Sequence, residues 1–410
     1  YLYGTNDYTG ATTVSQGTLQ VGSVAALGNV SVGTTVSSGA SLSLVNNVSF
    51  NAEPLSLAGT GYASGGALVS SGTITYSGAI TLADNSSIIS NGGALTISGG
   101  ITGAKDLTIG GAYNTTVSSV IGTTGALTKT GSGTLTLSVA NTFTGTTTVS
   151  QGILQLTHAN AIAGSSSASV SYGATLQLNA SSVTFAAVPL TITGYGVSSF
   201  GALRNINGNN TYPGNLTLSS LSQINSDPSQ TLTISGNVGG AGYPYLRGSG
   251  NIELSGALTF SSGSLEVYMY TSSSAVTLSG SATNTYSGGT VLYEGVLVLN
   301  KASALSSGNV YLNNSPSYAT LKFTSVDKTD YSSKFVSGSG ATIDTNGQNI
   351  TFASAFPSFG NGITVAGAGT LTLSGTNTSY SGLTTVNSDT TLIIGNTNAL
   401  GTYQVANNGT

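Results

Sequence analysis

The chain has 410 residues, only 5% of them charged, and a formal net charge of −4. Eight Lys and Arg residues are too few for the basic clusters that a phosphate backbone requires, so the composition argues against nucleic acid as a partner. Cysteine is absent, which excludes disulfides and thiolate metal sites. No apolar run reaches the ~20 residues of a membrane helix, so we expect no membrane insertion by this segment.

A sequence motif near the start of the chain, which we call the phrase, recurs further along. Residues Asn6 to Gln20 return from Asn141 to Gln155 with most positions unchanged, and the phrase returns loosely from Asn284 and from Asn377. Such self-similarity is typical of a chain built by stacking one structural unit. An aromatic residue lies two or three positions after the asparagine of each copy, and we expect it to fill the interior or a corner of the fold. These structural aromatics are Tyr8, Phe143, Tyr286 and Tyr380.

Between these copies the sequence shows short stretches with strand periodicity. Thr134–Leu137, Thr175–Leu178 and Leu371–Leu373 place an aliphatic residue at every second position. Gly and Asn interrupt such stretches at roughly every 10 to 14 residues, and no stretch keeps a helical period. We therefore expect an all-β protein with almost no helix.

The spacing of the recurring aromatic residues favours a solenoid over closed domains. The intervals are 135, 143 and 94 residues, so the third is 41 residues shorter than the first. A solenoid tolerates this loss because each coil contacts only its neighbours, whereas a β-sandwich could not close its core. At about 20 to 23 residues per coil, the difference is about two coils and the whole chain about 18. A tandem of β-sandwich binding modules is the alternative.

We accordingly expect one continuous solenoid over residues 1–410. Its internal repeats are expected at about 1–135, 136–278 and 279–372, with a partial repeat at 373–410. The chain begins without Met part-way through a repeat and ends part-way through another. These ends suggest a segment of a longer precursor.

Three consecutive stretches resemble a known repeat family. Gly131–Ser138, Asn141–Gly145 and Thr148–Leu156 are similar to the autotransporter-associated β-strand repeat, also called the passenger-associated transport repeat. Gly367–Gly375, with Asn377–Gly382, resembles it again. The resemblance implies a right-handed parallel β-helix in a secreted protein of the bacterial surface, often an adhesive one.

Few side chains are available for catalysis. The twelve acidic residues are scattered and His158 is the single histidine, so neither a catalytic triad nor a pair of glycosidase carboxylates is marked. Asp327 and Asp330 are close in sequence, but the charges from Lys322 to Lys334 alternate in sign, which predicts a solvated loop with mutual charge pairing. We predict no catalytic, metal-binding or cofactor-binding residues. A carbohydrate-binding or carbohydrate-cleaving β-helix, similar to a polysaccharide lyase or glycosidase, is the alternative.

Tyrosine gathers in one region of a chain that has 20 tyrosines and no tryptophan. Tyr243 and Tyr245 precede Glu266, Tyr268 and Tyr270, and the last three alternate with apolar residues. If the apolar residues point inward, an aromatic ladder faces solvent and can contact sugar rings or another copy of the chain. Ordinary stacking between coils is the alternative.

Together these features predict a non-catalytic structural or adhesive β-solenoid, located outside the cell on a bacterial surface. Low net charge leaves little repulsion between copies. The partners we expect are therefore other copies of the chain, joined laterally or end to end into fibres, and surface glycans. No cofactor is expected.

Overall fold

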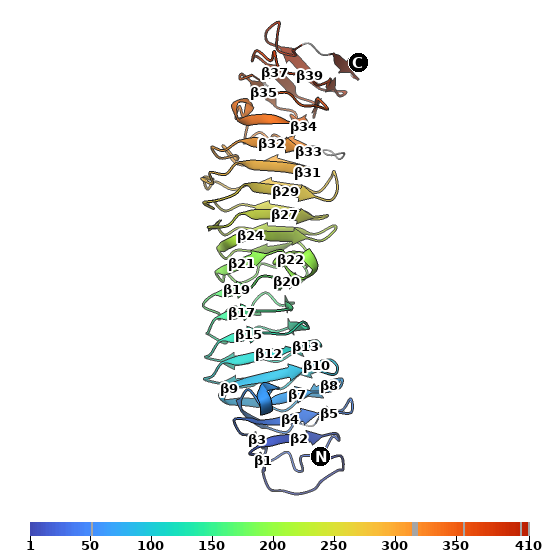
Figure 1. The fold of residues 1–410 in the computed structure, drawn as a ribbon, viewed down its shortest axis with the longest axis vertical. Coiled ribbons are helices and arrows are strands. Elements are labelled where there is room, and N and C mark those ends of the chain that lie inside the picture. The colour runs from blue at the N-terminus through green and yellow to red at the C-terminus, as the bar shows by residue number, and fades with distance from the viewer. Residues whose placement is uncertain (51, 314–318, 356, 402–403, 409–410) are drawn as a thin grey trace. The chain divides into compact units, whose positions relative to one another are not determined.

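The computed structural model describes residues 1–50, 52–313, 319–355, 357–401 and 404–408. They divide into two compact units, Tyr1–Asn207 and Gly208–Thr410. Across the described residues the only helical elements are three single turns of 3-10 helix, namely η1 (Tyr62–Ser64), η2 (Val197–Ser199) and η3 (Ser332–Lys334). The remaining regular structure consists of short parallel strands (Figure 1).

In the first unit, each strand pairs with the strand one coil later, which produces three columns of parallel strands. The first column holds β1 (Thr12–Val14), β3 (Thr34–Val36), β6 (Leu55–Gly59), the first half of β9 (Ile80–Ser90), β11 (Ile101–Gly103) and β14 (Ile121–Thr123). The second holds β2 (Gly17–Val21), β4 (Ala40–Leu44), β7 (Leu68–Ser70), the second half of β9, β12 (Leu107–Gly111), β15 (Leu127–Lys129), β17 (Thr147–Val149), β19 (Ala168–Val170) and β21 (Leu190–Gly194). The third holds β5 (Ser49–Phe50), β8 (Ile74–Tyr76), β10 (Leu95–Ile97), β13 (Thr115–Val117), β16 (Thr134–Leu137), β18 (Ile153–Leu156), β20 (Thr175–Asn179) and β22 (Leu203–Asn207).

The two-residue period of each strand separates a core side from an outer side. In the third column Ile97, Val117 and Leu137 stand in register on successive coils and are fully buried. Such rows bury apolar surface without interruption from coil to coil. Tight corners require glycine where the chain passes close to the coil before it. At Gly111, where φ is +110°, a Cβ atom would lie 2.1 Å from the Ser90 carbonyl oxygen.

The second unit is built in the same way. Its longest column holds β23 (Asn210–Tyr212), β25 (Thr231–Ile234), β28 (Asn251–Leu254), β30 (Ala275–Leu278), the second half of β31 (Thr290–Leu299), β33 (Ala319–Lys322), the second half of β34 (Phe335–Asp344), β36 (Ile363–Ala366), β38 (Thr384–Val386) and β40 (Val405–Asn407). A second column holds the second half of β24 (Leu216–Ser226), β27 (Pro244–Gly248), β29 (Leu265–Met269), the first half of β31, β32 (Val310–Asn313) and the first half of β34. The first half of β24 pairs with β26 (Val238–Gly240), and β35 (Asn349–Phe352), β37 (Thr370–Leu373) and β39 (Thr391–Ile394) form a separate sheet.

These pairings confirm the predicted all-β parallel β-solenoid, which has about 18 turns. The pairings also show how the recurring phrase is placed. Its first copy forms β1 and β2, in the first and second columns, whereas its second copy forms β17 and β18, in the second and third. The 135 residues between the two copies therefore make six full coils and one additional strand. As a result, the second copy lies one column further round the solenoid than the first.

The last two copies of the phrase obey the same rule. The third copy forms the two halves of β31, and the fourth forms β38 and β39. From the second half of β31, the column passes through β33, β34 and β36 to β38, which is four coils. The first strand of the phrase again occupies the column of the second strand of the preceding copy. The 94-residue interval thus has two coils fewer than the 135-residue interval, as the sequence predicts.

Candidate aromatic contact surface

The asparagine that opens each copy of the phrase joins neighbouring coils with its side chain. The Asn141 Oδ1 accepts a hydrogen bond from the Ile121 N–H at 2.8 Å, and its Nδ2 donates to the Ala161 carbonyl at 2.8 Å. Ile121 lies one coil before and Ala161 one coil after. The amide therefore supplies coil-to-coil hydrogen bonds where no regular strand forms. The second bond, to an alanine carbonyl of the next coil, recurs at Asn6, Asn284 and Asn377.

The recurring aromatic residues are parts of the coil. Phe143, Tyr286 and Tyr380 are buried, whereas Tyr8 is partly exposed. Each tyrosine hydroxyl shares a hydrogen bond with the hydroxyl of the threonine four residues later. Tyr286 also stacks on Phe260, with ring centroids 4.8 Å apart. None of the three buried rings offers a surface to a ligand.

The tyrosines of the predicted face come from two consecutive coils in the second unit, those of β27 and β29. The pairing of β27 with β29 places Tyr245 beside Glu266 and Arg247 beside Tyr268, and the inward residues between them are fully buried. Tyr243 packs over Gly263 of the next coil, where a Cβ would lie 2.1 Å from its ring. We call tyrosine–arginine patch the set Tyr245, Arg247, Glu266, Tyr268, Tyr270, Tyr293 and Glu294.

Arg247 lies at the centre of the patch. Its guanidinium carbon is 5.3 Å from the ring centroid of Tyr245, 5.3 Å from that of Tyr268 and 4.9 Å from that of Tyr270. The ring of Tyr268 also lies 6.0 Å from that of Tyr270 and 6.0 Å from that of Tyr293. Cation–π and edge-to-face contacts of this kind hold the aromatic rings in fixed orientations. The predicted contact face did not include Arg247 or Tyr293; the alternation Tyr245–Arg247 is the signal that places Arg247 on it.

The fold does not require the patch. In the first unit, β12 pairs with the second half of β9 in the same register as β27 pairs with the second half of β24 in the second unit. Thr108 therefore occupies the position of Tyr245, and Gly110 that of Arg247. The following coil has Thr128 where the second unit has Glu266. The same coils therefore form with small, uncharged residues at these positions. The aromatic and charged side chains are a specialisation of one copy.

The charges of the patch are not neutralised within it. Among the described residues, Arg247, Glu266 and Glu294 form no ion pair. Burial raises the pKa of the Glu266 carboxyl above its usual value. One cation and two carboxyl groups thus remain available on a partly exposed aromatic surface.

Comparison with known proteins agrees with this architecture. The sequence model of the passenger-associated transport repeat matches residues 1–21, 127–156, 271–299 and 363–388. We call these four matched regions the passenger repeats. Each matched region contains one of the four coil-bridging asparagines. The resemblance predicted from the sequence is confirmed, and the repeats and the β-solenoid fit the passenger domain of an autotransporter. No curated protein and no solved structure matches the chain.

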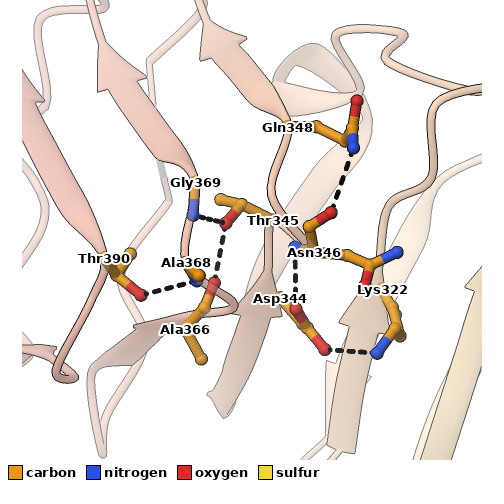
Figure 2. A network of polar contacts seen from close by, with 9 residues as sticks. All are labelled: Lys322, Asp344, Thr345, Asn346, Gln348, Ala366, Ala368, Gly369 and Thr390. Atoms are coloured by element: carbon orange, nitrogen blue, oxygen red, sulfur yellow. Dashed lines mark hydrogen bonds and ion pairs between the residues drawn. The ribbon is translucent and has the colours of Figure 1, made fainter.

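The charged segment between the third and fourth passenger repeats is a loop with Lys328 and Asp330 exposed, as predicted, but Asp327 departs from the prediction. Asp327 is 1% exposed and accepts hydrogen bonds from the Ala304 N–H at 2.8 Å and the Tyr331 hydroxyl at 2.6 Å. Lys322 pairs at 3.1 Å with Asp344, which lies in the next coil and also caps the turn after β34 (Figure 2). Burial lowers the pKa of Lys334 and the charge of Asp327 opposes that shift, so these two neighbours in sequence do interact. The ion pair of Lys322 with Asp344 was not predicted, because the register between coils decides which charges meet.

A lysine of the second passenger repeat is buried. The Lys129 Nζ donates to the carbonyl oxygens of Thr130 at 2.6 Å, Gly131 at 2.7 Å and Gln151 at 3.1 Å, and the residue is 2% exposed. Burial lowers the pKa of Lys129 to about 8. Gly152 leaves room for the ammonium group, since a Cβ there would lie 2.9 Å from Nζ.

Lys129 predicts a pH dependence of stability. Its folded pKa of about 8 lies below the unfolded value, so between pH 8 and pH 10 the unfolded state binds more protons and stability rises with pH. We expect a gain of up to about 3 kcal/mol over that range. Denaturant unfolding at several pH values should show this rise in the wild type and not in Lys129→Met, which keeps the length of the side chain. Parallel pH profiles would contradict it.

Two further features bear on function. Within the described ranges no helix is long and apolar enough to cross a membrane. In the same residues no group of three or more His, Cys, Asp or Glu side chains gathers as a metal site.

Proposed function

We propose that this chain is a non-catalytic structural and adhesive passenger β-solenoid, displayed outside the cell on a bacterial surface, that associates with copies of itself. The outer side of the coils supports this proposal. Thr136 donates to Gln155 at 3.2 Å and Gln155 to Gln177 at 2.8 Å, so uncharged polar side chains form a ladder that runs from the partly exposed Thr136 and Gln155 to the buried Gln177. Regular, weakly charged ladders offer many equivalent contacts, whose sum gives avidity.

Self-association is tested on the purified chain by sedimentation velocity over an approximately 100-fold range of concentration. We expect the weight-average sedimentation coefficient to rise with concentration, and electron microscopy of the same samples to show lateral or end-to-end assemblies. A coefficient that stays constant, with single particles at every concentration, would contradict the proposal.

Carbohydrate is the second candidate partner, because tyrosine rings with nearby carboxyl groups also suit sugar binding. The immobilised chain is incubated with a panel of neutral and acidic polysaccharides. Retention without new reducing or unsaturated ends would support a glycan-binding surface. Release of such ends would instead identify the enzyme alternative.

A further inference from the structure

We propose that the tyrosine–arginine patch is the contact between two copies of this chain, in which Arg247 of one copy meets Glu266 and Glu294 of the other. This inference rests on the proposed self-association and names the surface that carries it. A contact of this kind is isologous: the same patch on both copies faces itself across a two-fold axis.

The composition of the patch is that of a protein interface. Tyrosine and arginine are enriched at the centres of such interfaces, where they supply most of the binding energy. The patch places five of the chain's residues of these two kinds on three adjacent coils, and they are Tyr245, Arg247, Tyr268, Tyr270 and Tyr293. Because the rings already contact Arg247 and one another, little side-chain entropy is lost when a partner covers them.

Charge complementarity selects a second copy as the occupant. The chain has only eight Lys and Arg residues, so few cations are available for contacts with a partner. Arg247 is one of them, because it contacts tyrosine rings and forms no ion pair among the described residues. Glu266 stands diagonally across β27 and β29 from Arg247, and Glu294 lies beside Tyr268 on the following coil. When two such patches face each other, each cation meets the carboxyl groups of the other copy.

The first unit supplies an internal comparison. Thr108, Gly110 and Thr128 occupy the equivalent positions there and leave the coils intact. Coil formation therefore does not account for the tyrosine, arginine and glutamate of the second unit. A binding role accounts for them, since equivalent coils of the first unit form without them.

The test is a charge exchange on the full chain, followed by sedimentation velocity. Arg247→Glu is expected to weaken self-association at least about tenfold, and so is the double variant Glu266→Lys, Glu294→Lys. An equimolar mixture of the two is expected to restore it, because opposite charges again meet across the contact. Lys328→Glu, an exposed lysine outside the patch, is the control for the change in net charge. The variant Tyr245→Thr introduces the residue that the first unit has at this position and keeps every charge, and it is expected to weaken self-association through the lost ring.

The possible outcomes distinguish a failure of the proposed patch from a failure of the proposed self-association. Wild-type association that Arg247→Glu and the double variant leave unchanged would overturn the patch while leaving self-association intact. A wild type that stays monomeric would overturn both proposals. If both variants associate more weakly but their mixture does not recover, Arg247 of one copy does not contact Glu266 and Glu294 of the other. Association that stays weak only in the patch variants and recovers in their mixture supports the inference.

Discussion

Replacing Asn141 by alanine is expected to lower the free energy of unfolding by about 4 kcal/mol, because two buried backbone groups lose their partners. The Ile121 N–H and the Ala161 carbonyl each bond to the Asn141 amide, which is 4% exposed. Water cannot replace these bonds without opening the coil. Urea unfolding followed by circular dichroism measures the loss.

The matched control is Asn114→Ala in the same unit. The Asn114 Oδ1 accepts from the Thr134 N–H of the next coil at 2.9 Å, but this asparagine is exposed. Water takes its place there, so we expect a loss below about 1 kcal/mol. Equal losses for the two variants would show that burial of the bridging amide does not matter.

The second large effect is expected at Tyr286. Tyr286→Ala removes a fully buried ring that stacks on Phe260 and should cost about 3 to 5 kcal/mol. Tyr286→Phe removes only the hydroxyl that bonds to Thr290 and should cost about 1 kcal/mol. Phe143 occupies the equivalent position of the second passenger repeat, so the coil accepts phenylalanine.

Thermal and urea unfolding of both variants measure this difference. Hydrogen exchange of the coils around Tyr286 separates local opening from global unfolding, since a solenoid coil depends on its immediate neighbours. Similar losses for the alanine and phenylalanine variants would mean that the hydroxyl, and not the packed ring, stabilises the corner.

The repeats and the strand periodicity could be predicted from the sequence because both are local. A two-residue period marks which side chains face inward and which face outward wherever a strand forms, and Glu266 and Tyr268 lie on the outer side of theirs. The unequal spacing of Tyr8, Phe143, Tyr286 and Tyr380 predicted coils, since only a stacked architecture can lose two units and stay folded. The continuity of the solenoid from one unit to the other stays a prediction.

The partners of each side chain could not be predicted, because they lie one coil away. On the first column successive strands begin 20 to 25 residues apart, so the lengths of the corners decide which residues meet. This is why Asp327 was expected in a solvated loop and is instead buried against Tyr331.

The sequence by itself therefore determined the architecture of this protein: the parallel coils, their number and the recurring asparagine and aromatic residue. Only the tertiary structure showed that each copy of the phrase moves to the neighbouring column, and that Arg247 is surrounded by Tyr245, Tyr268 and Tyr270. The physical reason is that strand periodicity is set by the backbone of a single segment, whereas contacts between coils depend on the accumulated length of every corner between them.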